Sequence, residues 1–370
     1  MYNNLLFSLP KVTLTIILIF LLLPALSSAQ QTDAAIQQPD TTHPHTPFLT
    51  ITGAADGYYR YDFARKAAND LTSFTRSHNQ PEFGMAEVKL EHQTSRIDIV
   101  ADIAAGPREN EYAAADKGLA KGIKQLYLSY SPTSWLKFTA GTWATHLCYE
   151  SPDATANRNY SMSYMFSNDP FSHTGIRADA TFGKNGFMIG IANPSNYRTI
   201  PDSGRCNKNM IAQYSYAPND RVKILLNYVG GRDITDNRSH QYDIVVTAKA
   251  SNLFSWGFNA TVSRSSLATE KYLISRSWWG SAIYLNLDPH PWLGFTLRTE
   301  YFSDNNGVCL PAPANLVATT LSANFKLAHS HLTLIPEFRV DQADNPIFYH
   351  ADGSPARTAA SLLLAAVISF

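Results

Sequence analysis

Long segments in which apolar and polar residues strictly alternate are the feature that most restricts the fold of this chain. Leu49, Ile51 and Tyr59 occupy one parity, whereas Thr50 and Asp56 occupy the other. Such alternation predicts a β-strand with one apolar and one polar face. The same pattern recurs over residues 222–228, 242–248, 293–301 and 332–340. The sequence therefore predicts an all-β protein built from long, two-faced strands.

The segments that join these strands alternate between short and long. The short ones are rich in Pro, Gly, Asn, Asp and Ser, as tight turns require, and fall at 93–95, 132–134, 183–185, 218–220, 251–252, 288–290 and 328–330. The long ones fall at 64–82, 106–121, 144–172, 194–207, 231–238, 265–275, 304–314 and 342–356. Fifteen connections predict sixteen strands, with 14 or 18 as alternatives because boundaries read from sequence are loose by roughly 2–4 residues. The alternation is typical of a transmembrane antiparallel β-barrel with short periplasmic turns and long extracellular loops.

A soluble β-sandwich would also show alternating strands, but its strands average about 5–6 residues, and several segments here reach ten or more. Only 16% of the residues are charged and 12% are aromatic, a balance that fits one lipid face and one wet face. The zero net charge argues against a nucleic-acid partner. Tryptophans near strand ends are expected to form a membrane-interface girdle: Trp135, Trp143, Trp256, Trp278, Trp279 and Trp292.

The first 29 residues have the pattern of a cleaved secretory signal peptide. Lys11 precedes the apolar run 12–23, and small residues follow at 27–29. The alternative is a membrane anchor, for which the run is short of the roughly 20 residues that a span needs. Residues 30–47 are polar and aperiodic, which predicts a disordered lead-in. Residues 48–370 then form the barrel.

The chain ends on an apolar strand, 359–370, whose last residue is Phe370. A terminal aromatic residue in phase with the apolar face resembles the signal by which outer-membrane barrels are recognised for assembly. We therefore expect Phe370 to be an assembly signal read by the barrel-assembly machinery.

The most specific stretch of the sequence lies between residues 123 and 179. It contains YESPD at 149–153 and NRNYSMSYMFSNDPFSHTG at 157–175, and GAADGYYRYDF stands earlier at 53–63. In these segments the chain resembles the OmpL-like outer-membrane β-barrel porin family, over about residues 50–370. The resemblance implies a porin-like barrel in the outer membrane, with no cofactor and no catalytic residues.

The connection 145–172 is the longest, and a loop of this length in a compact fold is usually functional or disordered. Its aromatic content argues against disorder, so we expect it to fold into the barrel and narrow the pore. The alternative is a lid that packs over the rim. The residues expected at the constriction are Tyr149, Glu150, Asp153, Arg158, Tyr160, Asp169 and Phe171.

The polar parity of the strands predicts the lumen wall. Its expected charged residues are Arg60, Glu87, Lys89, Asp98, Arg177, Asp179, Arg298, Glu300, Glu337 and Arg339. Charges on a pore wall keep the channel wet and set its selectivity, and the mixed signs argue against a strong preference for anions or cations. The alternative is that opposite charges simply pair across strands.

No catalytic or nucleotide-binding motif is present: the sequence lacks a G-x-S-x-G elbow, an H-E-x-x-H helix and a P-loop. A hydrolase would need a nucleophile–base pair on the wall, for which His146, His173 and His240 are available. The segment 304–307 is faintly calcium-like but lacks the later Glu. Cys148, Cys206 and Cys309 all fall in long loops, so at most one pair can form a disulfide and free thiols are equally compatible.

These observations predict an outer-membrane porin for passive diffusion of small hydrophilic solutes or ions, without enzymatic activity or cofactor. Its expected partners are outer-membrane lipid, the assembly machinery, the solutes themselves and other copies of the chain in a homo-oligomer. Two alternatives stay open: a surface or adhesion barrel with a plugged lumen, and an outer-membrane hydrolase of lipase or protease type.

Overall fold

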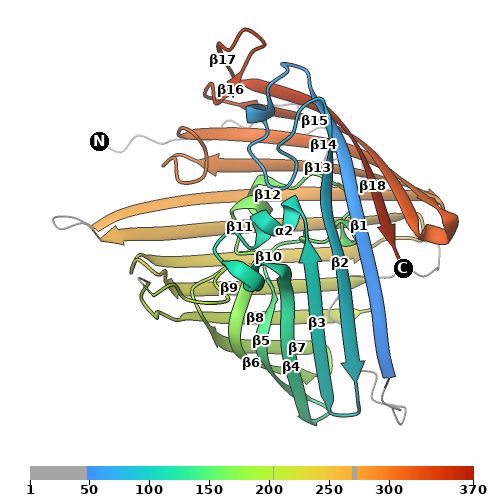
Figure 1. Cartoon of the computed structure of the whole chain (residues 1–370), viewed down its shortest axis with the longest axis vertical. Helices are drawn as coiled ribbons and strands as arrows, with labels where there is room; N and C mark the ends of the chain where they lie inside the picture. Colours follow the sequence, from blue (N-terminus) through green and yellow to red (C-terminus); the bar gives the residue numbers. More distant parts are fainter. Residues whose placement is uncertain (1–47, 203, 269–272) are drawn as a thin grey trace.

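A closed antiparallel barrel of sixteen strands makes up most of the computed structural model, which describes residues 48–202, 204–268 and 273–370 (Figure 1). The expected signal peptide and lead-in, 1–47, lie outside the described residues. The barrel strands are β1 (Phe48–Asp62), β2 (Gln80–Gln93), β3 (Ile97–Ala105), β4 (Ile123–Thr133), β5 (Leu136–Ala144), β6 (Ser172–Phe182), β7 (Asn185–Ala192), β8 (Asn209–Asn219), β9 (Val222–Arg232), β10 (Arg238–Lys249), β11 (Phe254–Ala268), β12 (Leu273–His290), β13 (Leu293–Asp304), β14 (Ala314–Leu327), β15 (Leu332–Ala343) and β18 (Thr358–Ser369).

The remaining elements are short and lie in the connections. Two helices and a two-stranded hairpin fall in long loops: α2 (Pro107–Tyr112), α3 (Tyr164–Asn168), β16 (Phe348–Tyr349) and β17 (Pro355–Ala356). Four 3₁₀ turns complete the set: η1 (Ala67–Asn69), η2 (Gly118–Gly122), η3 (Ala154–Ala156) and η4 (Ala328–Ser330). No helix in the described part of the chain is long and apolar enough to cross a membrane.

Neighbouring strands in the chain are neighbours in the barrel, and β1 pairs with β18 to close it. The last residue takes part in this closure, because the amides and carbonyls of Gly53 and Phe370 exchange two hydrogen bonds of 3.0 Å. A side chain at Gly53 would collide with the Phe370 ring, so a larger residue there would displace that ring. Residues 48 and 370 therefore lie on the short-turn side.

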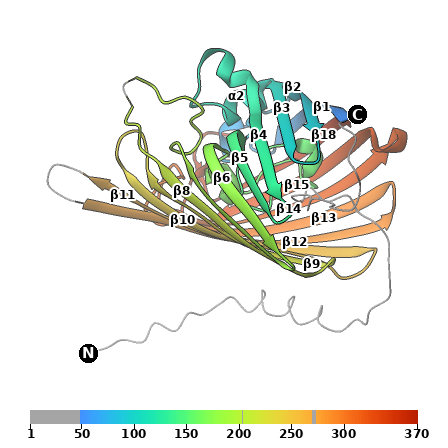
Figure 2. The ribbon, with the colours of Figure 1, turned by 90° about the horizontal axis from the view of Figure 1, so that it is seen from below.

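The alternation of connections is confirmed, and the strand count of sixteen is confirmed with it. Figure 2 shows the same barrel from below. The boundary prediction that failed most clearly lies between β11 and β12. Residues 265–275 were expected to be a loop, but β11 continues to Ala268 and β12 begins at Leu273. Leu267 pairs with Ile274 and Ala268 pairs with Leu273. This pairing keeps the segment in the sheet although its apolar content is low.

The two strand faces separate as expected, with one correction. On β3, Ile99 is 43% exposed on the outside, whereas Asp102 is 1% exposed inside. Trp135, Trp279 and Trp292 are half-exposed and fit a girdle, but Trp143 and Trp278 are buried on the lumen side. Strand parity, rather than nearness to a strand end, decides where these two rings point.

Candidate pore and its inserted loop

The connection from β5 to β6, residues 145–171, folds into the barrel and is called L3 here. Its first segment lies along β10–β12. The Cys148 amide donates to the Asp243 carboxylate at 3.3 Å, and the Tyr149 amide donates to the Asn259 side-chain oxygen at 3.2 Å. The Tyr149 ring stacks on Tyr284 with centroids 4.0 Å apart. L3 is therefore held against the wall rather than over the rim.

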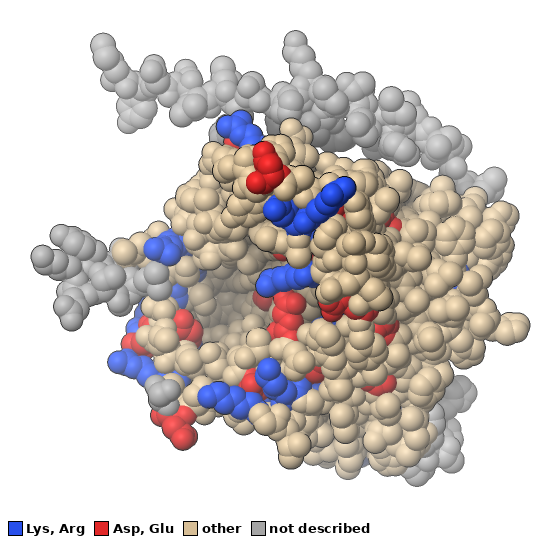
Figure 3. Space-filling view, turned by 45° about the horizontal axis from the view of Figure 1, so that its top comes forward, with Lys and Arg blue, Asp and Glu red and all other residues tan. Residues whose placement is uncertain are grey.

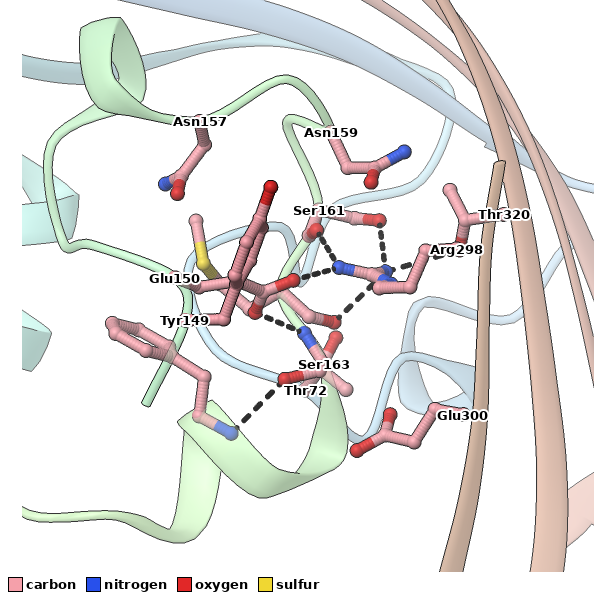
Figure 4. A network of polar contacts seen from close by, with 12 residues as sticks. Thr72, Tyr149, Glu150, Asn157, Asn159, Ser161, Ser163, Arg298, Glu300 and Thr320 are labelled. Carbon is pink, nitrogen blue, oxygen red and sulfur yellow. Dashed lines mark hydrogen bonds and ion pairs between the residues drawn. The ribbon is translucent and has the colours of Figure 1, made fainter. Parts of the chain in front are cut away.

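Arg298 on β13 is the centre of the polar network that fixes the middle of L3 (Figure 4). Its guanidinium pairs with Glu150 and donates to the Ser161 carbonyl at 2.7 Å and to Thr320 Oγ1 at 3.0 Å. The Arg298 side chain is fully buried. A buried charge is tolerated only when it is paired and hydrogen-bonded, so Arg298 and the loop require each other.

Two wall carboxylates bind the backbone of L3. Glu300 accepts hydrogen bonds from the amides of Tyr164 and Met165, at 2.7 and 2.8 Å. Glu337 accepts from the amide of Tyr160 at 2.9 Å. Amides at the start of a helix have no acceptor within it. The Glu300 carboxylate supplies the acceptors for the first two amides of α3.

The tip of L3 is tied to opposite walls. Arg158 forms an ion pair with Asp288 near the short-turn end of β12, and the Asn324 amide group donates to the Arg158 carbonyl at 2.9 Å. Asp153 pairs with Lys124 on β4. These ties carry L3 across the interior from one side of the barrel to the other.

The loops 63–79 and 106–122 pack on the other side of L3. The Arg108 guanidinium lies between the rings of Phe74 and Tyr160, 4.9 and 4.8 Å from their centroids. Phe171 stacks on Tyr112, with centroids 5.8 Å apart. Three loops thus share one buried aromatic cluster inside the barrel mouth.

Burial changes the protonation of several loop groups. It raises the pKa of Glu109 on α2 to about 8, against the opposing effect of Arg198. It raises the pKa of Asp169, whose carboxylate contacts the Gln241 side chain. It lowers the pKa of His146 to about 4, assisted by Arg177.

Part of the interior stays in contact with water. Lys89 and Glu91 pair at 2.8 Å with about a third of each side chain exposed, and Arg177 and Asp179 pair at 3.2 Å while partly exposed. Figure 3 shows a hollow in the molecular surface, with Lys and Arg around it and Asp and Glu within it. A cavity of about 510 Å³ also opens between the loops 63–79 and 305–313.

The structure brings the predicted residues together in two groups. Asp98, Lys89, Arg177 and Asp179 point inward and are partly exposed. Other predicted wall residues point inward but are at most 7% exposed because loops cover them, which corrects the expectation that they line water: Arg60, Arg298, Glu300, Glu337 and Arg339. Glu87 lies between the groups, paired with Lys124.

The loop residues need a similar correction. Glu150 and Asp169 were expected beside passing ions, but they are 7% and 4% exposed. Arg158 and Asp153 keep about a fifth to a quarter of their side chains exposed. Tyr160 and Phe171 pack among other rings, and Tyr149 lies against β12. Of its charged side chains, the loop therefore presents only those of Asp153 and Arg158, at its tip, to the open space.

Sequence reasoning missed several residues that hold L3. Lys124 stands at the start of β4, and Asp288 fell in a predicted turn, although β12 runs to His290. Arg108 lies in a loop with no periodicity. Asp288 lies four residues after the inward-facing Tyr284, so the alternation of β12 predicts that it also points inward. It was missed because this strand was predicted to end too early.

The other candidate sites find ordinary structural roles. Asp304 accepts the amides of Val308, Cys309 and Leu310, so its carboxylate serves its own loop. The three cysteines are free thiols. Within the described residues, no three His, Cys, Asp or Glu side chains gather as a metal site.

A closed sixteen-strand barrel with a polar interior and a loop folded into it defines the class of outer-membrane porins. The chain belongs to the family described as "Putative beta-barrel porin-2, OmpL-like", which matches residues 48–370. It is an outer-membrane β-barrel of this porin family, as the sequence resemblance predicted.

Solved structures of similar fold include an outer-membrane channel, a porin and an outer-membrane protein. The channel DcaP of Acinetobacter baumannii is 12% identical with a TM-score of 0.60, covering 88% of this chain and 97% of that one. An anion-selective porin from Comamonas acidovorans is 10% identical with a TM-score of 0.58, covering 88% and 100%. OmpT of Vibrio cholerae is 10% identical with a TM-score of 0.55, covering 87% and 97%. At this identity the likeness concerns the fold, and no curated protein matches the chain.

Proposed function

We propose that the protein lets small hydrophilic solutes and ions diffuse passively across the outer membrane, through the part of the lumen that L3 does not fill. The observation that carries this proposal is the division of the inward-facing charges. Those beneath L3 are buried and bound to it, whereas Lys89, Glu91, Arg177 and Asp179 stay in contact with water.

A hydrated, charged wall lets a solute exchange its hydration shell for wall groups while it passes. The tip of L3 faces this space with Arg158 and Asp153, each tied to a wall carboxylate or ammonium. We infer that the constriction lies between the tip and the wall of β2–β6. Pairing leaves neither sign dominant there, so the selectivity is weak.

Swelling of proteoliposomes tests this function. Full-length protein reconstituted in lipid vesicles is expected to admit arabinose faster than a disaccharide, and to exclude large dextrans. Uptake no faster than in protein-free vesicles would contradict the proposal.

The extent of the anchoring favours one second candidate, a barrel whose lumen is plugged and whose loops serve adhesion. Arg298, Glu300 and Glu337 hold L3 by five hydrogen bonds of 2.9 Å or less. If the lumen is plugged, the barrel folds normally but the vesicles do not swell. The swelling experiment therefore separates the channel from the plugged adhesion barrel.

The finer expectations also remain proposals. We infer that a signal peptide ending near residue 29 is cleaved on export and that Phe370 is read by the assembly machinery. We also infer that copies associate in the membrane and that the barrel carries no catalysis.

A further inference from the structure

A basic patch lies on the outer surface of the barrel at the long-loop ends of β9, β10 and β11, which are adjacent in Figure 1. Arg232 and Arg238 stand opposite each other across β9 and β10, and His240 stands opposite Arg264 across β10 and β11. These four residues are called the basic patch. Strand parity turns them away from the lumen, because Tyr242 on the same parity of β10 is 54% exposed outside.

The patch sits directly above a row of aromatic residues. Tyr228 and Tyr242 are paired across β9 and β10, two residues nearer the short-turn side than His240. The Tyr228 hydroxyl lies 2.9 Å from His240 Nδ1, which joins the two levels. Trp279 extends the row, since it pairs with Val262, the partner of Tyr242. Such rings mark the membrane–water interface.

The height of the patch above the aromatic row follows from the strand rise of about 3.4 Å per residue, reduced by the strand tilt of roughly 35–45° in such barrels. His240 and Arg264 lie about 7 Å, and Arg232 and Arg238 about 14 Å, farther along the strands than the aromatic row. On the extracellular side of a porin this is the level of the outer-leaflet headgroups. The guanidinium groups therefore meet lipid headgroups rather than acyl chains.

The charge of this region is unbalanced within the described residues. Asp236 pairs with Arg205 at 2.7 Å and with Arg232 at 3.0 Å. Asp233, the other nearby carboxylate, accepts hydrogen bonds from Thr235 and Asn237 in its own loop. Among the described residues, neither Arg238 nor Arg264 has a carboxylate within ion-pair distance. With Arg205 included, four guanidinium groups face two carboxylates.

We propose that the basic patch binds the phosphate groups of an outer-leaflet lipid whose acyl chains lie on the apolar wall below it. Guanidinium groups bind phosphate oxygens by paired, charge-assisted hydrogen bonds. The outward direction of the side chains and their place above the aromatic row favour a lipid over a free anion, which would reach lumen or loop-tip groups instead. The proposal rests on the outer-membrane placement of the barrel and is independent of conduction.

Native mass spectrometry of the full-length protein in detergent, titrated with bis-phosphorylated lipid A, tests the proposal. The variant R232Q/R238Q/R264Q is expected to bind lipid A at least tenfold more weakly than the wild type. The matched control R96Q/K184Q/R221Q removes three exposed positive charges from the short-turn side and is expected to stay within twofold. Lipid A stripped of its phosphates is expected to bind the wild type as weakly as bis-phosphorylated lipid A binds the patch variant.

Heat-modifiable migration on gels shows that both variants are folded, so a lost barrel is not mistaken for a lost site. Equal lipid A affinity of the patch variant and the wild type would overturn the proposal. So would inorganic phosphate that displaces lipid A at equal concentration, because the site would then be one for free anions. If the patch variant binds lipid A more weakly than the wild type, but vesicles with the wild-type protein do not swell, the lipid site is supported and the channel function is refuted.

Discussion

At the scale of single residues, charge inside the barrel serves mainly to position L3. Arg298, Glu300 and Glu337 are almost fully buried, and each finds its partner on the loop. Removing one member of such a buried set leaves the other charge without compensation, which costs about 3–5 kcal/mol. These side chains are therefore expected to set the place of the loop rather than to meet passing ions.

Replacing Arg298 with Met should release the middle of L3. Glu150 loses its partner and the Ser161 carbonyl loses a donor, so the loop leaves the wall more often. Trypsin should then cleave after Arg158 at least tenfold faster than in the wild type, as measured by mass spectrometry of the fragments. R221M, which alters an exposed turn residue, is the control, and equal cleavage in R298M and R221M would show that Arg298 does not hold the loop.

His146 gives the stability of the barrel a dependence on pH. Burial lowers its pKa to about 4, so below pH 6.5 the unfolded chain binds a proton that the folded protein does not. The free energy of unfolding is therefore unaffected by His146 above pH 6.5 and decreases as the pH falls from 6.5 to 4. The total decrease is roughly 3 kcal/mol, at about 1.4 kcal/mol per pKa unit. Urea midpoints in lipid vesicles should fall less steeply over this range for His146→Gln than for the wild type. Parallel curves for the two proteins would contradict the assignment.

Strand parity predicted which residues face inward, but not which of them stay wet. Lys89 on β2 and Arg298 on β13 both point inward, yet Lys89 is partly exposed and Arg298 is fully buried. The difference depends on where L3 lies, and this is fixed by contacts between residues far apart in the sequence, such as Glu150 and Arg298, which are 148 positions apart. Alternation along one strand carries no information about such contacts.

At the scale of elements, strands and turns were largely predictable, since period-two alternation and turn residues are local signals. The inward fold of L3 was also expected from its length and its aromatic residues. The failures arose where pairing overrides composition. The polar ends of β11 and β12 remain strands because they pair with each other, and Trp143 and Trp278 follow the parity of their strands into the interior.

The tip of L3 should control conductance. Replacing residues 151–157 by two glycines removes the Asp153–Lys124 tie and the η3 turn while keeping Arg158 and the anchors of Tyr160 and Tyr164. Single-channel conductance should rise by about twofold or more because the cross-section widens at the tip. A matched insertion of two glycines in the exposed turn at 183–184 should change nothing. Unaltered conductance in the shortened variant would mean that the tip does not border the pathway.

Deletion of Phe370 should impair assembly more than stability. Its backbone closes β18 on β1 through two hydrogen bonds with Gly53, but its ring is 67% exposed, so losing the ring should cost the folded barrel less than the roughly 1.5–3 kcal/mol of a fully buried side chain. Folded protein in the outer membrane should decrease severalfold, as counted on heat-modifiability gels, whereas the urea midpoint of the assembled fraction shifts modestly. Equal membrane yield of the truncated and complete chains would contradict the role of Phe370 as a signal.

At the scale of the whole molecule, the barrel separates three environments. Its outside meets lipid through half-exposed apolar residues, its upper interior is filled by three interlocked loops, and its remaining interior is lined by paired charges in contact with water. The third environment provides the pathway for solutes, and membership of the porin family supports this role.

Planar-bilayer recording of the purified full-length protein tests this claim most directly. We predict stepwise, ohmic current increments in potassium chloride, with a small reversal potential in a tenfold salt gradient because the exposed charges of the lumen are paired. A correctly folded barrel that inserts into the bilayer without any current steps would contradict the account, and would show that L3 and its neighbouring loops close the lumen.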